Sequence, residues 1–188
     1  DILRMGGVSE KEMNQGVLKS TRKRFIWLFI NLLTAILASI VISFFDASIE
    51  QMVALAVLMP IVASMGGNAG TQTLTLTVRA LATKDLVQNN RRKIFSKEIS
   101  ISILNGLIFS VITGIAVYLW FQDTSLSIIV GASMIVNIFS AGFFGFLIPY
   151  TLSYFKVDPA IASSVFVTTI TDVVGFFSFL GLASIYLF

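Results

Sequence analysis

The chain has 188 residues, of which 56% are hydrophobic and 12% charged, and its formal net charge is +3. A soluble domain would cover its surface with more polar groups than this, so the composition indicates a membrane protein. The sequence contains no cysteine and no histidine. Disulfides, thiolate metal sites and histidine proton shuttles are therefore excluded, and any ion chemistry uses carboxylates and neutral oxygen atoms.

The apolar residues gather into five runs separated by short polar connections. Each run is at least as long as the ~20 residues that a helix needs to cross the hydrocarbon of a bilayer. The sequence therefore predicts an all-α integral membrane protein with a polar cytoplasmic lead-in over 1–24 and a five-helix transmembrane pore domain over 25–188. The predicted spans are about 25–45, 52–78, 99–121, 127–154 and 159–188.

The basic residues predict the orientation of the spans. Of the 13 Lys and Arg residues, six lie in 1–24, six in 79–98, and the last is Lys156. The connections 46–51 and 122–126 contain none. Because cytoplasmic loops are enriched in Lys and Arg, the N-terminus is expected inside and the C-terminus outside. This distribution explains the net charge without a nucleic-acid partner, although a contact with lipid headgroups stays open.

One carboxylate interrupts the fifth apolar run. Asp172 follows Pro159 by 13 residues, which places it about 20 Å along a helix and near the bilayer centre. A charge at that depth costs about 2.5–3.5 kcal/mol on insertion scales, so such residues usually face a cavity or a partner. Helix packing alone would explain small polar neighbours, but the carboxylate favours an ion or proton path. Residues on the same helical face are Ala160, Ser164, Thr168, Thr171 and Gly175.

The second apolar run carries a proline and three glycines between Pro60 and Thr73. These residues weaken or bend a helix, and in lipid the carbonyl groups that they free must be satisfied by protein, water or an ion. A tight helix crossing is the alternative interpretation, although the amide side chains exceed what packing requires. Asn137 of the fourth run is a weaker candidate for the same pathway. The polar face of the second run comprises Ser64, Gly67, Asn68 and Thr71, with Gln72 at its edge.

An environment made only of oxygen atoms suits hard cations such as Mg²⁺, Ca²⁺ or Mn²⁺. One carboxylate per chain is little charge for a divalent ion, so a two-fold homodimer that brings together two Asp172 side chains is expected. Mg²⁺ gives up its water reluctantly, which favours a hydrated ion. We predict Asp172, Thr168 and Asn68 as metal contacts, and Ser64, Gly67, Thr71, Gln72, Ala160, Ser164, Thr171 and Gly175 as pore-lining residues.

Two stretches also resemble a known family. The run PIVASMGGNAGTQTLTLTVRALA from Pro60 resembles the second span of MgtE-type magnesium channels, and TTITDVVGFFSFLGLA from Thr168 resembles their fifth span. The resemblance covers essentially the whole chain. It implies a homodimeric Mg²⁺ channel of the bacterial inner membrane, with the second and fifth spans lining the pore and Asp172 at the dimer axis. Familiar members carry a cytosolic N-domain and CBS domains, and only the end of their connecting helix could correspond to 1–24.

Passive Mg²⁺ conduction is therefore the leading hypothesis, with selectivity over Mn²⁺, Co²⁺ and Ca²⁺ left open. The alternative is a proton- or cation-coupled secondary transporter that uses Asp172, although internal repeats typical of such folds are not visible. An intramembrane enzyme would need a Ser/His pair or two catalytic aspartates, so enzymatic activity is not expected. A purely structural membrane subunit is the remaining class.

Overall fold

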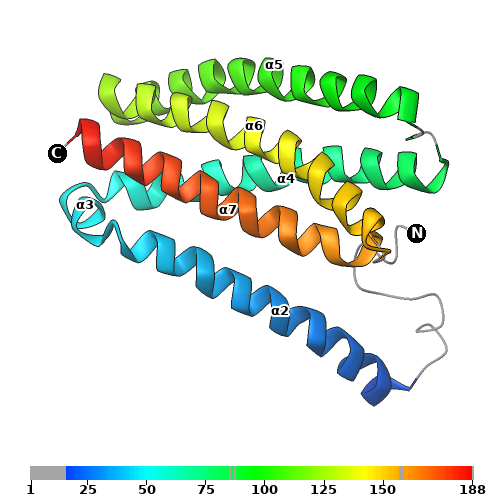
Figure 1. The fold of residues 1–188 in the computed structure, drawn as a ribbon. Coiled ribbons are helices and arrows are strands. Elements are labelled where there is room, and N and C mark those ends of the chain that lie inside the picture. Colours follow the sequence, from blue (N-terminus) through cyan, green and yellow to red (C-terminus); the bar gives the residue numbers. More distant parts are fainter. Residues whose placement is uncertain (1–15, 85, 87, 157–158, 188) are drawn as a thin grey trace.

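The computed structural model describes residues 16–187 except 85, 87, 157 and 158, and the side chains of 23, 88, 89 and 160–162 also lie outside the described part. Long helices account for most of it (Figure 1). In chain order they are α2 (Val17–Ser43), α3 (Asp46–Gln51), α4 (Ala54–Ala82), α5 (Gln88–Phe121), α6 (Thr124–Tyr154) and α7 (Pro159–Tyr186).

Within these described ranges, five helices are long and apolar enough to cross a membrane, namely all but the short α3. The prediction of five apolar helices is confirmed. Two connections differ from expectation. Residues 46–51 form α3, and α5 begins at Gln88, so about ten residues assigned to a polar connection are helical. Gln, Arg, Lys and Glu are good helix formers, and a helix that leaves the hydrocarbon can continue into water.

The helices run back and forth, and basic residues occupy one end of the bundle. The first turns of α2, the end of α4, the start of α5 and the end of α6 all lie on the same side in Figure 1. Three of the reversals follow residues with left-handed backbone, Lys84, Gln122 and Lys156, with φ of 60°, 54° and 58°. A left-handed residue after the last helical turn ends a helix, because it redirects the chain.

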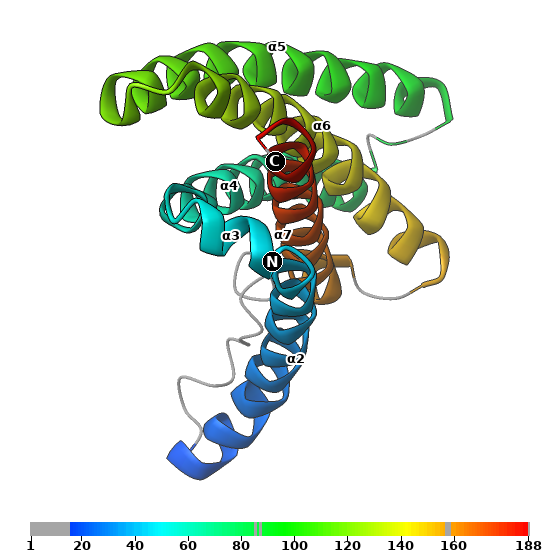
Figure 2. The same ribbon diagram turned by 90° about the vertical axis from the view of Figure 1, so that its left-hand side faces the viewer.

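Helix α6 is the central element. It is the most buried of the five long helices, and it contacts α4, α5 and α7. Helix α5 covers one side of α6, whereas α4 and α7 pack on α6 and on each other. Helix α2 contacts α7 and diverges from the other helices, as Figure 2 shows. The arrangement leaves α4 and α7 as neighbouring helices that α5 does not cover.

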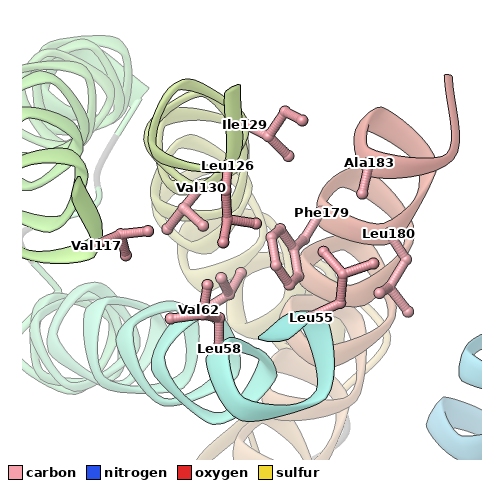
Figure 3. Packing of buried hydrophobic residues seen from close by; sticks show 10 residues of the cluster. All are labelled: Leu55, Leu58, Val62, Val117, Leu126, Ile129, Val130, Phe179, Leu180 and Ala183. Carbon is pink, nitrogen blue, oxygen red and sulfur yellow. The ribbon is translucent and has the colours of Figure 1, made fainter. Parts of the chain in front are cut away.

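The apolar core lies where α4, α6 and α7 meet, toward the end of the bundle that holds α3. Phe179 of α7 is fully buried between Leu55 and Leu58 of α4 and Leu126 of α6 (Figure 3). In a bilayer the alternative to burial is contact with lipid tails, so this cluster stabilises the bundle mainly through the dispersion contacts of close packing. This cluster fixes one end of α4 and α7 against the central helix.

Small residues bring α5 close to α6. A Cβ atom added to Gly142 would lie 1.8 Å from Ser102 Oγ, and one added to Gly131 would lie 2.9 Å from Ser110 Oγ. The row of Gly106, Ser110 and Gly114 in α5 faces α6 and has this role. Gly106 faces the backbone of Ile135. Small residues at such crossings let helix backbones approach in membranes.

Candidate functional site

Helix α4 presents two different faces through its glycine-rich segment. It continues without a break from Ala54 to Ala82 with Pro60 inside it, so the glycines do not interrupt the helix. Successive residues of a helix point about 100° apart. Gly66 and Gly70 are buried, whereas the neighbouring Gly67 is partly exposed and Asn68 is exposed. The segment therefore divides into a packing face and an outward polar face.

The outward face of α4 carries the polar residues that the sequence singled out. Ser64, Asn68, Thr71 and Gln72 are exposed. The Thr71 hydroxyl donates to the Gly67 carbonyl at 2.8 Å, and the Asn68 amide donates to Ser64 Oγ at 3.4 Å. A hydroxyl that donates its proton to its own helix leaves its lone pairs free to accept. The face thus offers neutral oxygen atoms, which suit a hard cation or its water shell.

The polar stripe of α7 splits between two environments. Thr168 is exposed, and Ser164 and Asp172 are partly buried at the protomer surface. Thr171 and Gly175 are buried inside the protomer. The Thr171 hydroxyl donates to the Thr168 carbonyl at 2.9 Å, and the same carbonyl takes part in the backbone hydrogen bonds of α7, so both of its lone pairs have partners. Of the remaining predicted residues, Ala160 lies outside the described side chains.

The buried residues of the stripe form the contact between α7 and its neighbours. A Cβ atom on Gly70 of α4 would lie 2.6 Å from Val167 Cγ1 and 3.6 Å from the methyl group of Thr171. On the opposite side, a Cβ atom on Gly145 of α6 would lie 3.0 Å from the Gly70 carbonyl oxygen. The inward glycines thus bring the backbones of α4 and α6 close together and let side chains of α7 pack against the backbone of α4.

Asn137 of α6 is the polar residue at the centre of this contact. Its side chain is fully buried, and its Nδ2 donates to the Val62 carbonyl of α4 at 2.7 Å. A Cβ atom would lie 2.3 Å from Nδ2 if added to Gly66 of α4, and 2.7 Å if added to Gly175 of α7. The sequence left open whether Asn137 reaches the pathway. The structure places it between the two helices that carry the candidate ligands.

Two features at the basic end of the bundle were not anticipated from the sequence. Glu98 was assigned to a polar connection, yet it lies inside α5 and is only 5% exposed. The Arg91 guanidinium of α5 donates to the Tyr150 hydroxyl of α6 and lies 5.2 Å from its ring centroid. Both belong to the α5 side of α6. The helix-forming composition of residues 88–98 could have predicted that this segment is helical. Hydropathy does not detect this composition, because it measures only the apolar character of the residues.

No group of three or more acidic residues that could hold a metal ion occurs within the part of the chain that the structure describes. Asp172 is accompanied instead by hydroxyl and amide oxygens on α7 and α4, and these two helices contact each other. These features define an α-helical membrane protein with a candidate cation path along the outer faces of α4 and α7.

The chain belongs to the MgtE family of divalent cation transporters, whose family model matches residues 59–182. It is similar to three curated proteins that carry the name magnesium transporter MgtE. Identity is 34% over 190 residues with the protein of Thermus thermophilus, covering 100% of this chain and 42% of that protein. It is 32% over 165 residues for Bacillus subtilis, covering 88% and 37%. For Enterococcus faecalis it is 30% over 191 residues, covering 100% and 41%.

The chain thus spans about two-fifths of the length of these relatives. The family match extends from Met59 of α4 to Leu182 of α7. It therefore includes the glycine-rich segment of α4 and the segment of α7 around Asp172. The resemblance inferred from these two segments is confirmed.

The adjacent glycines of α4 provide a test of the two faces. We expect Gly66→Ala to lower the free energy of unfolding by about 1–3 kcal/mol, because its methyl group would overlap the Asn137 amide. Gly67→Ala is the matched control, since a Cβ atom there has nothing within 4 Å. Alanine should raise stability there by up to about 1 kcal/mol through helix propensity. Thermal unfolding of the purified protein measures both. Equal midpoints would contradict the assigned faces.

Proposed function

We propose that the chain conducts Mg²⁺ passively across the membrane as a homodimer, with α4 and α7 of both copies lining the pore and Asp172 of each copy close to the dimer axis. One observation carries the proposal. Polar side chains of α4 and α7 are exposed on the outside of the protomer in the middle of apolar helices. The names of the family and of the relatives, which are magnesium transporters, support the choice of ion.

Lipid is an unsuitable neighbour for this face. Polar groups without partners cost several kcal/mol each in hydrocarbon, so they are normally covered by protein or lie in water. The outward surfaces of α2 and α5 are mainly apolar, with exposed residues such as Leu32, Ile36, Leu104 and Ile108, and the exposed polar side chains of α2 include Asn31 and Ser39. The exposed Asn68, Thr71 and Thr168 of α4 and α7 depart from this apolar pattern. A second copy and a water-filled passage would together remove the conflict.

A two-fold axis beside α7 would bring a second carboxylate close to the ion. One Asp172 per protomer leaves a divalent ion half neutralised, whereas two copies bring two carboxylates and two sets of hydroxyl and amide oxygens. Mg²⁺ keeps most of its water in proteins, so Asp172, Thr168 and Asn68 would contact its water shell at least as much as the ion. The ion needs no further energy source, because an inside-negative potential contributes about 2.3 kcal/mol per charge per 100 mV.

The charge distribution supports an orientation for this path. The described basic residues lie at the end of the bundle formed by the start of α2, the α4–α5 connection and the end of α6. Asp46, Glu50 and Asp123 lie at the other end. By the positive-inside rule the basic end faces the cytoplasm, with the N-terminus inside and the C-terminus outside, as expected for a bacterial inner membrane.

Asp172→Asn should lower Mg²⁺ flux into vesicles by at least about tenfold, because a unit charge about 4 Å from a cation contributes ~4 kcal/mol at an effective dielectric of 20. A Mg²⁺-sensitive dye in proteoliposomes measures the rate. Asp46→Asn is the matched control, since this exposed aspartate lies on α3 at the end of the bundle. Its flux should equal that of the wild type.

Two outcomes would change the assignment. Wild-type flux through correctly folded Asp172→Asn would remove Asp172 from the ion path. Flux that required a proton gradient, instead of following the Mg²⁺ gradient alone, would favour a coupled transporter that uses the same carboxylate.

The dimer axis can be located by cross-linking, because the chain contains no cysteine. A single Thr168→Cys variant, one turn before Asp172 on an exposed position, should form a covalent dimer in membranes with a short bifunctional thiol reagent. Leu104→Cys, on the exposed apolar face of α5, is the control and should remain monomeric on a denaturing gel. Cross-linking through position 104 alone would place the dimer interface on α5 and contradict the proposed axis.

A further inference from the structure

Asn137 contacts both proposed pore helices, through Val62 and Gly66 of α4 and through Gly175 of α7. Its amide nitrogen binds the Val62 carbonyl of α4, less than two turns before Asn68. The same amide packs against Gly175 of α7, three residues after Asp172. Helix α6 has no residue among the predicted pore-lining set, so this side chain acts on the ion path only through the helices that it joins.

Stability does not explain an asparagine at this position. The side chain is fully buried, yet Asn137 Oδ1 has no hydrogen-bond partner among the described residues. A buried acceptor without a partner is destabilising, and an apolar side chain would avoid that cost. What the amide adds is a directional link, because a hydrogen bond fixes the position of one helix along another more narrowly than apolar contact does.

The two flanking glycines make this link rigid. Gly66 and Gly175 leave no space around the amide, since a Cβ atom on either would lie under 3 Å from Nδ2. A side chain confined from both sides can adopt few rotamers. Asn137 is thus held in one orientation while it binds the Val62 carbonyl. This contact restricts how far α4 can shift along its axis relative to α7 near the candidate ligands.

We propose that Asn137 is a positioning residue that aligns α4 with α7, and that its hydrogen bond to Val62 determines how well the ion path discriminates Mg²⁺ from larger divalent cations. The inference rests on the proposed function. Mg²⁺ keeps several waters in a nearly ideal octahedron, so protein groups that contact this water shell must lie at fixed positions, whereas Ca²⁺ accepts six to eight oxygen ligands in flexible arrangements. A small misalignment of α4 and α7 therefore impairs Mg²⁺ conduction more than Ca²⁺ conduction.

Asn137→Ala removes the link without adding bulk. We expect Mg²⁺ flux in proteoliposomes to fall about fivefold, the factor that corresponds to one buried hydrogen bond, and the ratio of Mg²⁺ to Ca²⁺ flux to fall at least about twofold. The ratio is decisive because it does not depend on how many molecules are folded. Ser140→Ala is the matched control. Ser140 lies on the same helix and is also buried, and its hydroxyl has no hydrogen-bond partner in the described part of the chain, so its removal should leave both quantities unchanged.

A double variant separates the hydrogen bond from the space that it occupies. Asn137→Ala combined with Gly66→Ala returns a methyl group to the vacated volume but restores no donor to Val62. We expect its thermal midpoint to exceed that of Asn137→Ala while the flux ratio stays low. The ratio is measured in whichever of the two variants retains a cooperative thermal transition.

Three results would overturn the inference. One is an unchanged flux ratio in folded Asn137→Ala, and another is full recovery of the ratio in the double variant, which would assign the effect to packing. The third is a wild-type protein that conducts no Mg²⁺, which would overturn the proposed function and this inference together. The first two leave the proposed function intact, so the failures are distinguishable.

Discussion

The structure depends on one electrostatic constraint, the carboxylate of Asp172 in the middle of an apolar helix. Asp172 lies partly buried at the surface of the protomer, next to the exposed Thr168 on the same helix. Hydrocarbon does not accept a charged group or an uncovered polar row, so these residues require water, a cation or a second protein surface. The outward polar face of α4 adds amide and hydroxyl oxygens on the neighbouring helix. The proposed cation path would account for the polar residues on both helices.

The glycine-rich segment of α4 combines a packing face and a polar face within one continuous helix. Gly66 and Gly70 let α6 and α7 approach on one side, and Asn68 and Thr71 present oxygen atoms on the other. The central α6 provides the support for both helices, through an apolar cluster toward the α3 end and through Asn137 further along. Adjacent residues of one segment thus carry packing and the proposed ion contact, and this double role would explain its unusual composition.

Hydropathy predicted the five apolar helices well, because lipid imposes length and polarity on every span. It predicted the helix ends poorly. The polar start of α5 is helical although it lies beyond the predicted apolar run, and residues 46–51 form a short helix where a connection was expected. Hydropathy detects burial in lipid, whereas helix formation continues wherever backbone hydrogen bonds and propensity allow.

The site shows a different limit of sequence analysis. Small polar residues serve both helix packing and ion contact, so periodicity identifies a stripe but not the neighbour that it faces. Thr171 and Gly175 share the stripe of Asp172, yet they are buried against Gly70 and Asn137. Their role in lining the pore of a dimer stays a prediction. The sequence identifies Asn137 as a weaker candidate for the pathway, but it does not reveal the partner of this side chain, because Val62 lies 75 residues away.

The most direct test of the shared carboxylate is a density map of the membrane-embedded protein prepared with Mg²⁺ and compared with one prepared in chelator. The account predicts a two-fold dimer with a Mg²⁺-dependent peak between the two copies of Asp172, surrounded by water and by oxygens of α4 and α7. Protomers that associate through α5 and leave Asp172 facing lipid, or a dry interface without a passage between the two α7 helices, would contradict it.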